Sequence, residues 1–249
     1  MKVNDWISTC NEQALETRKN FGISLYSPID IMKLLRDARI NVIIEPLMSN
    51  ISGFFLRNGR NQLVFINSAK TKGHQSFTGA HEFYHIKYDL DLSGRACTVG
   101  EFDKKSPSEF KADIFAAFLL APDEAINFHI HRMGKHDDKL TYNNIIELEQ
   151  YFGLSHRAML NRLKEMELIT PEELKEFRIG VTNQALRSGY DITLYQPTLE
   201  VKILSDYAQK ALYALEKNLI TEGKYEELLL EGGLANILYG EEIKEEEIF

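Results

Sequence analysis

The sequence predicts an α+β fold, in which a small β-sheet packs on a pair of helices, followed by a helical helix-turn-helix-like segment and a helical C-terminal extension. Strand-like segments with a hairpin come early, two helical segments follow at 74–88 and 106–120, and helical patterns dominate the rest. We expect residues 1–136 to form the core domain, 137–180 the helix-turn-helix-like segment and 181–249 an acidic helical extension.

The N-terminal elements carry local start and turn signals. Ser27 and Pro28 indicate a helix start, with serine as the cap and proline in the first turn. Asn58-Gly59 is typical of a hairpin turn. We therefore expect helices at 3–19 and 27–38, and strands at 41–45, 51–56 and 62–67.

The central helical segment contains His81-Glu82-x-x-His85, with Gly73 expected at its N-terminus. Residues four apart lie on one face of a helix, so the two imidazoles are spaced to hold one zinc ion. Glu82 would lie beside the metal and act as a base on a metal-bound water. No proline interrupts this segment, which supports the helix.

A zinc site needs a third protein ligand, and Glu109 is our candidate. It lies 24 residues beyond His85, enough chain for a second helix to return antiparallel. Asp113 is one turn further on and would accept the second N–H of a ligating histidine. A capping box formed by Ser106 and Glu109 around Pro107 is the alternative explanation of Glu109, but it leaves Asp113 unexplained.

The string FTGAHEFYH at 77–85, followed by ExxADxFAAxLLAP at 109–122, resembles the ImmA/IrrE family of zinc metallopeptidases over about residues 27–170. Tyr84 stands where that family usually has glycine, which would narrow the cleft or alter substrate choice. The resemblance implies that an edge strand above the metal binds an extended substrate. Our candidate is the strand at 62–66, with Leu63, Val64, Phe65 and Tyr84 as substrate contacts; a strand paired on both sides is the alternative.

Composition narrows the class of protein. The chain has 249 residues, 44% hydrophobic and 27% charged, without a run of membrane-helix length or a signal-peptide core. Cys10 and Cys97 are too few for a disulfide framework, and neither has a metal-ligand spacing, so we expect reduced thiols in a cytoplasmic protein. The net charge is −8, and residues 199–249 hold twelve acidic residues and five lysines. This distribution argues against a general nucleic-acid binder.

The other histidines are expected outside the ligand set. His74 would be solvated near the helix start. His129, His131 and His136 would be surface residues, with the alternative that one reaches the cleft as an oxyanion donor.

The second half reads as helical. Residues 141–169 resemble a helix-turn-helix, with a packing role favoured over DNA contact because Glu165 and Glu167 offset the basic side chains. Residues 181–198 read as a connection, 199–219 as one long amphipathic helix and 221–230 as another, before an acidic end at 241–249.

These patterns predict a zinc-dependent endopeptidase. His81 and His85 would be neutral and Glu109 anionic, so the site with Zn²⁺ carries about +1 and activates a bound water, whose proton Glu82 relays. The resemblance implies a protein substrate, a helix-turn-helix repressor of a mobile element or stress regulon. Alternatives are a non-catalytic metal-containing binding module and a DNA-binding regulator using residues 141–169. The stripe on 199–232 would either recruit a basic partner or dock permanently on the core.

Overall fold

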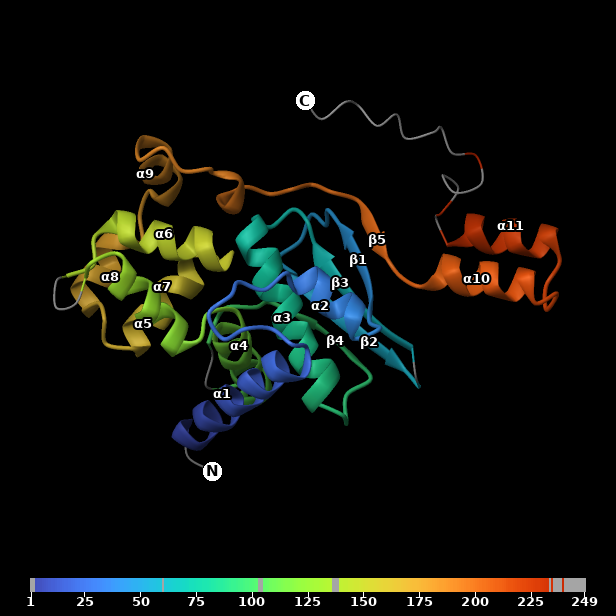
Figure 1. The fold of residues 1–249 in the computed structure, drawn as a ribbon, viewed down its shortest axis with the longest axis horizontal. Helices are drawn as coiled ribbons and strands as arrows, with labels where there is room; N and C mark the ends of the chain where they lie inside the picture. The colour runs from blue at the N-terminus through green and yellow to red at the C-terminus, as the bar shows by residue number, and fades with distance from the viewer. Residues whose placement is uncertain are drawn as a thin grey trace. The chain divides into compact units, whose positions relative to one another are not determined.

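The computed structural model describes residues 3–59, 61–102, 105–135, 139–232, 234 and 239, and it divides the chain into two compact units, 1–203 and 204–249. Figure 1 labels the elements. The elements up to the fourth strand are α1 (Val3–Asn20), α2 (Ile31–Asp37), β1 (Asn41–Glu45), β2 (Gly53–Asn58), β3 (Asn61–Asn67), α3 (Lys72–Tyr88) and β4 (Gly94–Cys97). Those that follow are α4 (Pro107–Leu120), α5 (Asp123–Arg132), α6 (Tyr142–Phe152), α7 (His156–Glu165), α8 (Pro171–Phe177), α9 (Val181–Arg187), the 3₁₀ turn η1 (Thr193–Tyr195) and β5 (Lys202–Leu204). The α+β fold class is confirmed.

The five strands have the order β4-β2-β3-β1-β5. β2 and β3 form the expected antiparallel hairpin, β1 runs parallel to β3, and β4 pairs antiparallel with β2. The prediction that residues 62–66 form an edge is therefore wrong, and Leu63, Val64 and Phe65 lie in the interior of the sheet. The edge near the helix pair is β4, a four-residue strand without the apolar alternation that would mark it in the sequence.

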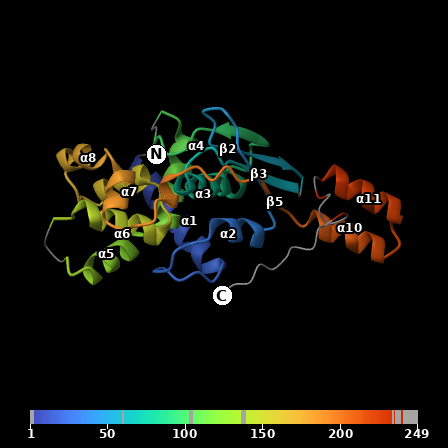
Figure 2. The same ribbon diagram turned by 90° about the horizontal axis from the view of Figure 1, so that it is seen from above.

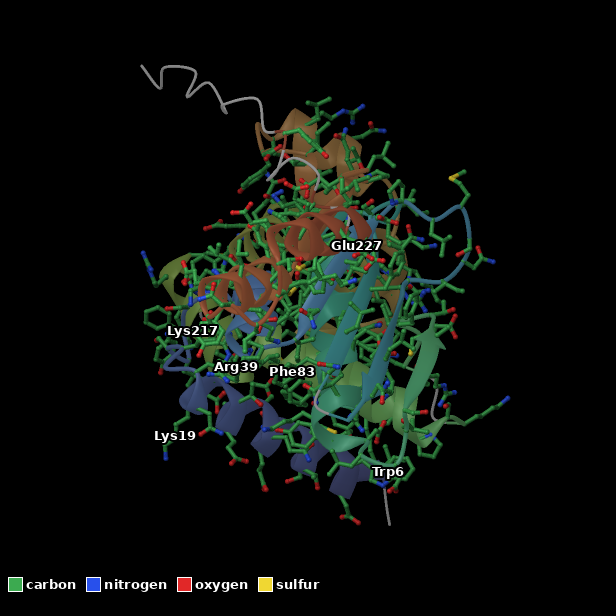
Figure 3. The ribbon with its side chains drawn as sticks, turned by 90° about the vertical axis from the view of Figure 1, so that its right-hand side faces the viewer. Trp6, Lys19, Arg39, Phe83, Lys217 and Glu227 are labelled. Carbon is green, nitrogen blue, oxygen red and sulfur yellow. The ribbon has the colours of Figure 1, made fainter. Side chains whose placement is uncertain are left out.

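One face of the sheet is covered by helices. α3 lies against β2 and β3 (Figure 2), α2 lies against β1 and α3, and α4 packs between α3 and α1 (Figure 1). Side chains on this face of the strands are at most 3% exposed: Val42, Ile44, Phe55, Val64 and Ile66. Phe83 of α3, labelled in Figure 3, is 2% exposed and lies between the rings of Phe21 and Phe115. Burial of one such ring contributes about 2–3 kcal/mol, so this ring holds α3 against α4 and the end of α1.

Two helix starts differ from expectation. α2 begins at Ile31, where the Asp30 carboxylate accepts from Lys33 N at 3.0 Å, so Asp30 and not Ser27 is the cap. α3 begins at Lys72 with Thr71 as its cap, which places Gly73 inside the helix. In both cases a capping oxygen three residues before a free amide decides the boundary.

The helix-turn-helix-like segment forms α6 and α7. Gly153 ends α6 in the left-handed region at φ 63°, and the Ser155 side chain caps α7. α7 buries an apolar face and one cation: Ala158, Met159, Leu160, Leu163 and Arg162. The expected packing role is therefore confirmed for this face.

The region after α8 contains more regular structure than its polar composition indicates. Residues 181–198, expected as a connection, contain α9 and η1. The three-part division at residues 136 and 180 stays a prediction.

The unit 204–249 contains α10 (Tyr207–Glu216) and α11 (Glu222–Glu231), which pack against each other. The expected helix over 199–219 is wrong in its first third, because Lys202–Leu204 is the strand β5 and Leu199 has φ 52°. The helix at 221–230 is confirmed with Thr221 as its cap. The acidic end at 241–249 lies outside the described residues. Within the described residues, no helix combines the length and apolarity that a membrane crossing requires.

Candidate metal centre

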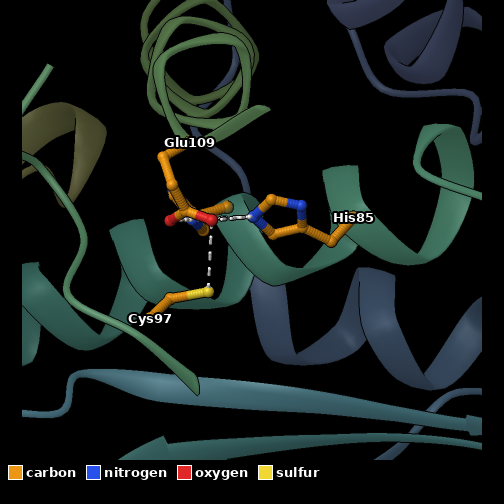
Figure 4. A group of neighbouring side chains, drawn as sticks. His85, Cys97 and Glu109 are labelled. Carbon is orange, nitrogen blue, oxygen red and sulfur yellow. Dashed lines mark hydrogen bonds and ion pairs between the residues drawn. The ribbon is translucent and has the colours of Figure 1, made fainter. Parts of the chain in front are cut away.

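α3 and α4 bring the three predicted ligands together. His81 and His85 are 0% exposed, and their Nε2 atoms lie 3.0 Å apart. Glu109, from the first turn of α4, reaches both: one carboxylate oxygen lies 3.3 Å from His81 Nε2 and the other 3.5 Å from His85 Nε2. Figure 4 shows Glu109 and His85 pointing toward one another from their two helices.

The capping-box explanation of Glu109 is wrong. Ser106 is the N-cap of α4, but its side chain makes no capping hydrogen bond within the described part of the chain. Pro107 starts the helix, and the Glu109 side chain turns to the histidines instead of back to the cap.

Two carboxylates fix the orientation of the imidazoles. Asp113 is 2% exposed, and it accepts from Gly100 N at 2.8 Å and from Phe102 N at 2.7 Å, as an ionised carboxylate does. His81 Nδ1–H therefore donates to it, at 2.8 Å. In the same way His85 Nδ1–H donates to Asp89 at 2.6 Å. Sequence reasoning found Asp113 and missed Asp89, although its i+4 spacing from His85 could have indicated it.

This orientation turns the two Nε2 atoms toward one another, 3.0 Å apart, and without an ion they are bridged by a proton that His81 can also share with Glu109. A metal ion at this place would displace that proton and accept both Nε2 lone pairs. Histidines whose Nδ1–H donates a hydrogen bond to a carboxylate are typical metal ligands. The donor set therefore fits a metal ion.

A fourth group, which sequence reasoning missed, belongs to this cluster. Cys97, the last residue of β4, has its Sγ 3.8 Å from Glu109 Oε1 and 3.8 Å from Glu82 Oε2. The ligand atoms of His81, His85, Cys97 and Glu109 all lie within 4.8 Å of one another. No sequence signal marks Cys97, because it is a single cysteine on a strand that the sequence does not reveal.

Glu82 lies beside this cluster and is 0% exposed. Its Oε1 has no hydrogen-bond partner among the described residues. Burial raises the pKa of Glu82 to about 8, against a smaller opposing effect of His81. A carboxylate with a free oxygen and a raised pKa is suited to accept and return a proton near neutral pH.

The pKa values of His81, Glu109 and Cys97 are also shifted by burial and by their neighbours in the cluster. Burial lowers the pKa of His81, but hydrogen bonds to Asp113, Cys97 and Glu109 outweigh it and raise the pKa well above its usual value. Burial would raise the pKa of Glu109, but its bond to His81 holds that pKa below the usual value. Burial also raises the pKa of the Cys97 thiol to about 12. The cluster thus concentrates lone pairs and negative charge around one point.

The remaining candidates lie elsewhere. Tyr84 is 4% exposed, with its ring 5.4 Å from that of Phe115, and a substrate contact by it stays a prediction. His74 is not solvated: its Nε2 lies 2.8 Å from Ser52 Oγ, and burial lowers its pKa to about 4. His129 is 8% exposed and packs against Tyr151, so the surface prediction is wrong for it.

His131 is exposed as expected, whereas His136 lies outside the described residues.

A pocket of about 190 Å³ gives access to the cluster from the β4 side, with Arg95, Cys97 and Glu109 among its lining residues. Arg95 Nε lies 3.3 Å from Glu109 Oε1, and its side chain is 44% exposed. A ligand entering here would meet Arg95 beside the carboxylate of Glu109.

Comparison with known protein families identifies a family that matches about half of the chain. The family Peptidase M78, described as the IrrE N-terminal-like domain, matches residues 35–164. That span contains α3, β4 and α4, and so every residue of the cluster. No curated protein matches the chain.

Proposed function

The chain belongs to the Peptidase M78 family, the IrrE N-terminal-like domain, and we propose that it is a zinc-dependent endopeptidase. Membership of a peptidase family implies a protein substrate. The observation that carries the proposal is the convergence of His81, His85 and Glu109, with both histidines held by carboxylates so that Nε2 faces inward.

Each residue has a role in this mechanism. His81, His85 and Glu109 would hold the ion, and a bound zinc supplies Lewis acidity for water activation and carbonyl polarisation. Asp113 and Asp89 keep the imidazoles in the tautomer with Nε2 free. Glu82 takes the proton of the attacking water and delivers it to the leaving amine. Its Oε2, which lies 3.8 Å from Cys97 Sγ, is the oxygen on the side of the cluster.

The edge of β4 is our candidate for substrate binding. Within the described residues β4 pairs only with β2, so its second edge can accept an extended segment by main-chain hydrogen bonds. β4 carries Cys97 into the cluster, and such a segment would pass beside it. This placement replaces the interior strand β3 in the role predicted from the sequence.

For the substrate we propose a helix-turn-helix repressor of a mobile element or stress regulon, on the resemblance to ImmA/IrrE peptidases. Such a protein is basic on its DNA-binding face, and this chain carries a net charge of −8. The two free cysteines, Cys10 and Cys97, suit a reducing compartment, and we propose the cytoplasm.

The substitution Glu82→Gln tests the mechanism. We expect the variant to keep its zinc and to lose cleavage of a small helix-turn-helix protein encoded beside this chain by at least about 10²-fold, because the amide cannot take a proton. Glu147→Gln, an exposed change on α6, is the matched control and should cleave like the native chain. Cleavage by Glu82→Gln at the native rate would contradict the mechanism.

A second candidate function is a metal-containing binding module that does not hydrolyse. The observation that favours it is Cys97, because four protein ligands are the arrangement of structural zinc sites. It predicts that Glu82→Gln keeps every biological activity. A DNA-binding role for residues 141–169 has less support, since α7 turns Met159 and Arg162 into the core.

A further inference from the structure

Cys97 occupies a position that its burial alone does not explain. A buried cysteine commonly acts as a small apolar side chain. Here the sulfur faces polar groups: Glu109, Glu82 and the imidazole of His81. Figure 4 shows the Cys97 side chain directed toward Glu109, which in turn points toward His85. Alanine would fill an apolar site as well and would not place a soft donor there.

The spacing of the four groups matches a single tetrahedral ion. Zinc binds nitrogen and oxygen at about 2.0–2.2 Å and sulfur at about 2.3 Å, which puts tetrahedral donors roughly 3.3–3.6 Å apart. The separations here are 3.0 Å between the two Nε2 atoms, 3.3 Å from His81 Nε2 to one Glu109 oxygen, and 3.5 Å and 3.8 Å from the other oxygen to His85 Nε2 and to Sγ. All four ligand atoms lie within 4.8 Å of one another, so shifts of up to about an ångström would bring them onto one ion.

The sulfur also stands where the hydrolytic water must stand. That water has to lie within about 2.6–3.2 Å of Glu82 and next to the ligands. Cys97 Sγ lies 3.8 Å from Glu82 Oε2 and 3.8 Å from Glu109 Oε1, so it is next to both the base and a ligand. A water and the sulfur cannot both occupy this place.

The backbone holds Cys97 firmly. Ser52 N donates to Cys97 O at 3.0 Å, and Cys97 is paired with Gly53 across the strands. Downstream, Gly100 N and Phe102 N donate to Asp113, the carboxylate that also holds His81. The strand is fixed, but the cysteine side chain has a single χ angle to turn, so the sulfur can leave without the strand.

From this geometry we infer that Cys97 Sγ is a fourth protein ligand that closes the metal site of the resting chain. The inference rests on the proposed function and deepens it, because hydrolysis then requires the sulfur to leave. In that step the sulfur releases the ion and takes up one proton from solvent, and a water molecule takes its place. No electrons are exchanged. The chain is thus a latent peptidase whose inhibitor is its own edge strand.

Cobalt substitution tests the ligation. The full chain loaded with one equivalent of Co²⁺ should show thiolate-to-cobalt charge-transfer absorption in the near ultraviolet. Cys97→Ala should lose that absorption while it keeps the cobalt, and Cys10→Ala, which removes the other thiol, should retain it. A native chain that binds cobalt without this absorption would overturn the inference, whatever the variants do.

Acetohydroxamate, a small metal chelator, tests the closure without any substrate. It needs an open position on the ion, so we expect it to bind Cys97→Ala cobalt chains at least about tenfold tighter than native or Cys10→Ala chains, as measured by the shift of the cobalt spectrum. Equal affinity in all three would overturn the closure.

The two proposals fail separately. If charge transfer and hydroxamate binding behave as expected but neither native nor Cys97→Ala zinc chains cleave the repressor, the ligation stands and the peptidase proposal falls. If the native cobalt chain shows no charge transfer yet the zinc chain cleaves and Glu82→Gln does not, the peptidase proposal stands and Cys97 is no ligand.

Discussion

At the scale of single residues, the orientation of the two imidazoles is the feature on which the site depends. Each Nε2 faces inward only because the opposite nitrogen donates to a buried or half-buried carboxylate, Asp113 or Asp89. Such carboxylates typically change metal affinity 10- to 100-fold when they are removed. Their roles are unequal, because Asp113 also accepts hydrogen bonds from the backbone amides of Gly100 and Phe102, whereas no such bond to Asp89 is seen among the described residues.

The substitution Asp113→Asn follows from this difference. The asparagine amide has one oxygen to accept from the three donors, His81 Nδ1–H, Gly100 N–H and Phe102 N–H, and its NH₂ group faces them without an acceptor. His81 therefore loses its fixed tautomer, and the loop at 100–102 loses a hydrogen-bond acceptor. We expect zinc affinity to fall about 10- to 100-fold, measured by competition with a chelator. Asp89→Asn is the comparison, with a smaller loss. Unchanged affinity in Asp113→Asn would contradict its positioning role.

A second residue-scale feature is a buried ion pair away from the cluster. Glu149 of α6 is 0% exposed and accepts from His156 Nδ1 at 2.6 Å and from Tyr195 at 2.8 Å. His156 Nε2–H donates to Phe177 O, so both ring nitrogens donate and the imidazole is charged. Burial lowers the pKa of His156, but Glu149 outweighs it and the net pKa is raised. Burial raises the pKa of Glu149.

Both shifts predict the same pH dependence. A raised pKa in the folded state gives stability that is present below the unfolded pKa of the group and is lost as pH rises through the folded value. We therefore expect the free energy of unfolding to fall as pH rises, from 4.5 upward through Glu149 and from 6.5 upward through His156, as measured by urea titrations at several pH values. His156→Gln should lower stability by about 3–5 kcal/mol and flatten this dependence. A variant with the native slope would show that other groups cause it.

At the scale of elements, the close contact of β2 with α3 positions the catalytic side of the cluster. Gly53 opens β2, and a Cβ at this residue would lie 2.5 Å from Phe65 O, 2.5 Å from Thr78 Cγ2 and 3.5 Å from Glu82 Oε1. Only a glycine lets the strand pass this near the helix. Gly53 is also the residue that pairs with Cys97 across the strands, so Gly53 sets the distance between Cys97 Sγ and the Glu82 carboxylate.

Gly53→Ala should consequently destabilise the chain by about 1–3 kcal/mol, because backbone and helix must separate. The measurement is urea unfolding, with zinc affinity as a second readout that should weaken. Gly223→Ala is the matched control: among the described residues nothing lies within 4 Å of its Cβ, and alanine in a helix stabilises by about 0.5–1 kcal/mol. If Gly53→Ala is as harmless as its control, β2 does not set this spacing.

At the scale of the whole molecule, the sequence predicted what local spacing determines. His81 and His85 are four residues apart and therefore share one face of α3. Glu109 and Asp113 have the same spacing on α4. The structure brings the two helices and the three predicted ligands together. The order of the strands in the sheet depends on contacts between residues far apart in the sequence, which local spacing does not reveal. β3 became interior because β1 crosses to lie parallel beside it, and β4 is a strand only through its pairing with β2. Cys97 depends on both, and no spacing in the sequence could place it at the cluster.

The last prediction concerns the unit 204–249, which carries eleven acidic residues and four lysines, a charge of −7. We propose that it recruits the basic repressor. Truncation after Thr198 would also remove β5, so the sharper variant ends at Ser205 and keeps the sheet intact. It should stay folded, retain zinc and cleave an unspecific peptide like the full chain. It should cut the repressor more slowly, by about tenfold or more at low salt, because electrostatic attraction raises association rates.

A full-length control separates charge from structure. Changing the exposed Glu222, Glu226 and Glu231 of α11 to glutamine leaves the fold of the unit in place and removes three charges. If charge recruits the repressor, this variant loses part of the rate and part of its salt dependence, since salt screens exposed charges beyond about 10 Å at 0.1 M. If the truncated chain instead unfolds or loses its zinc, the unit belongs to the folded core, and recruitment is not its role.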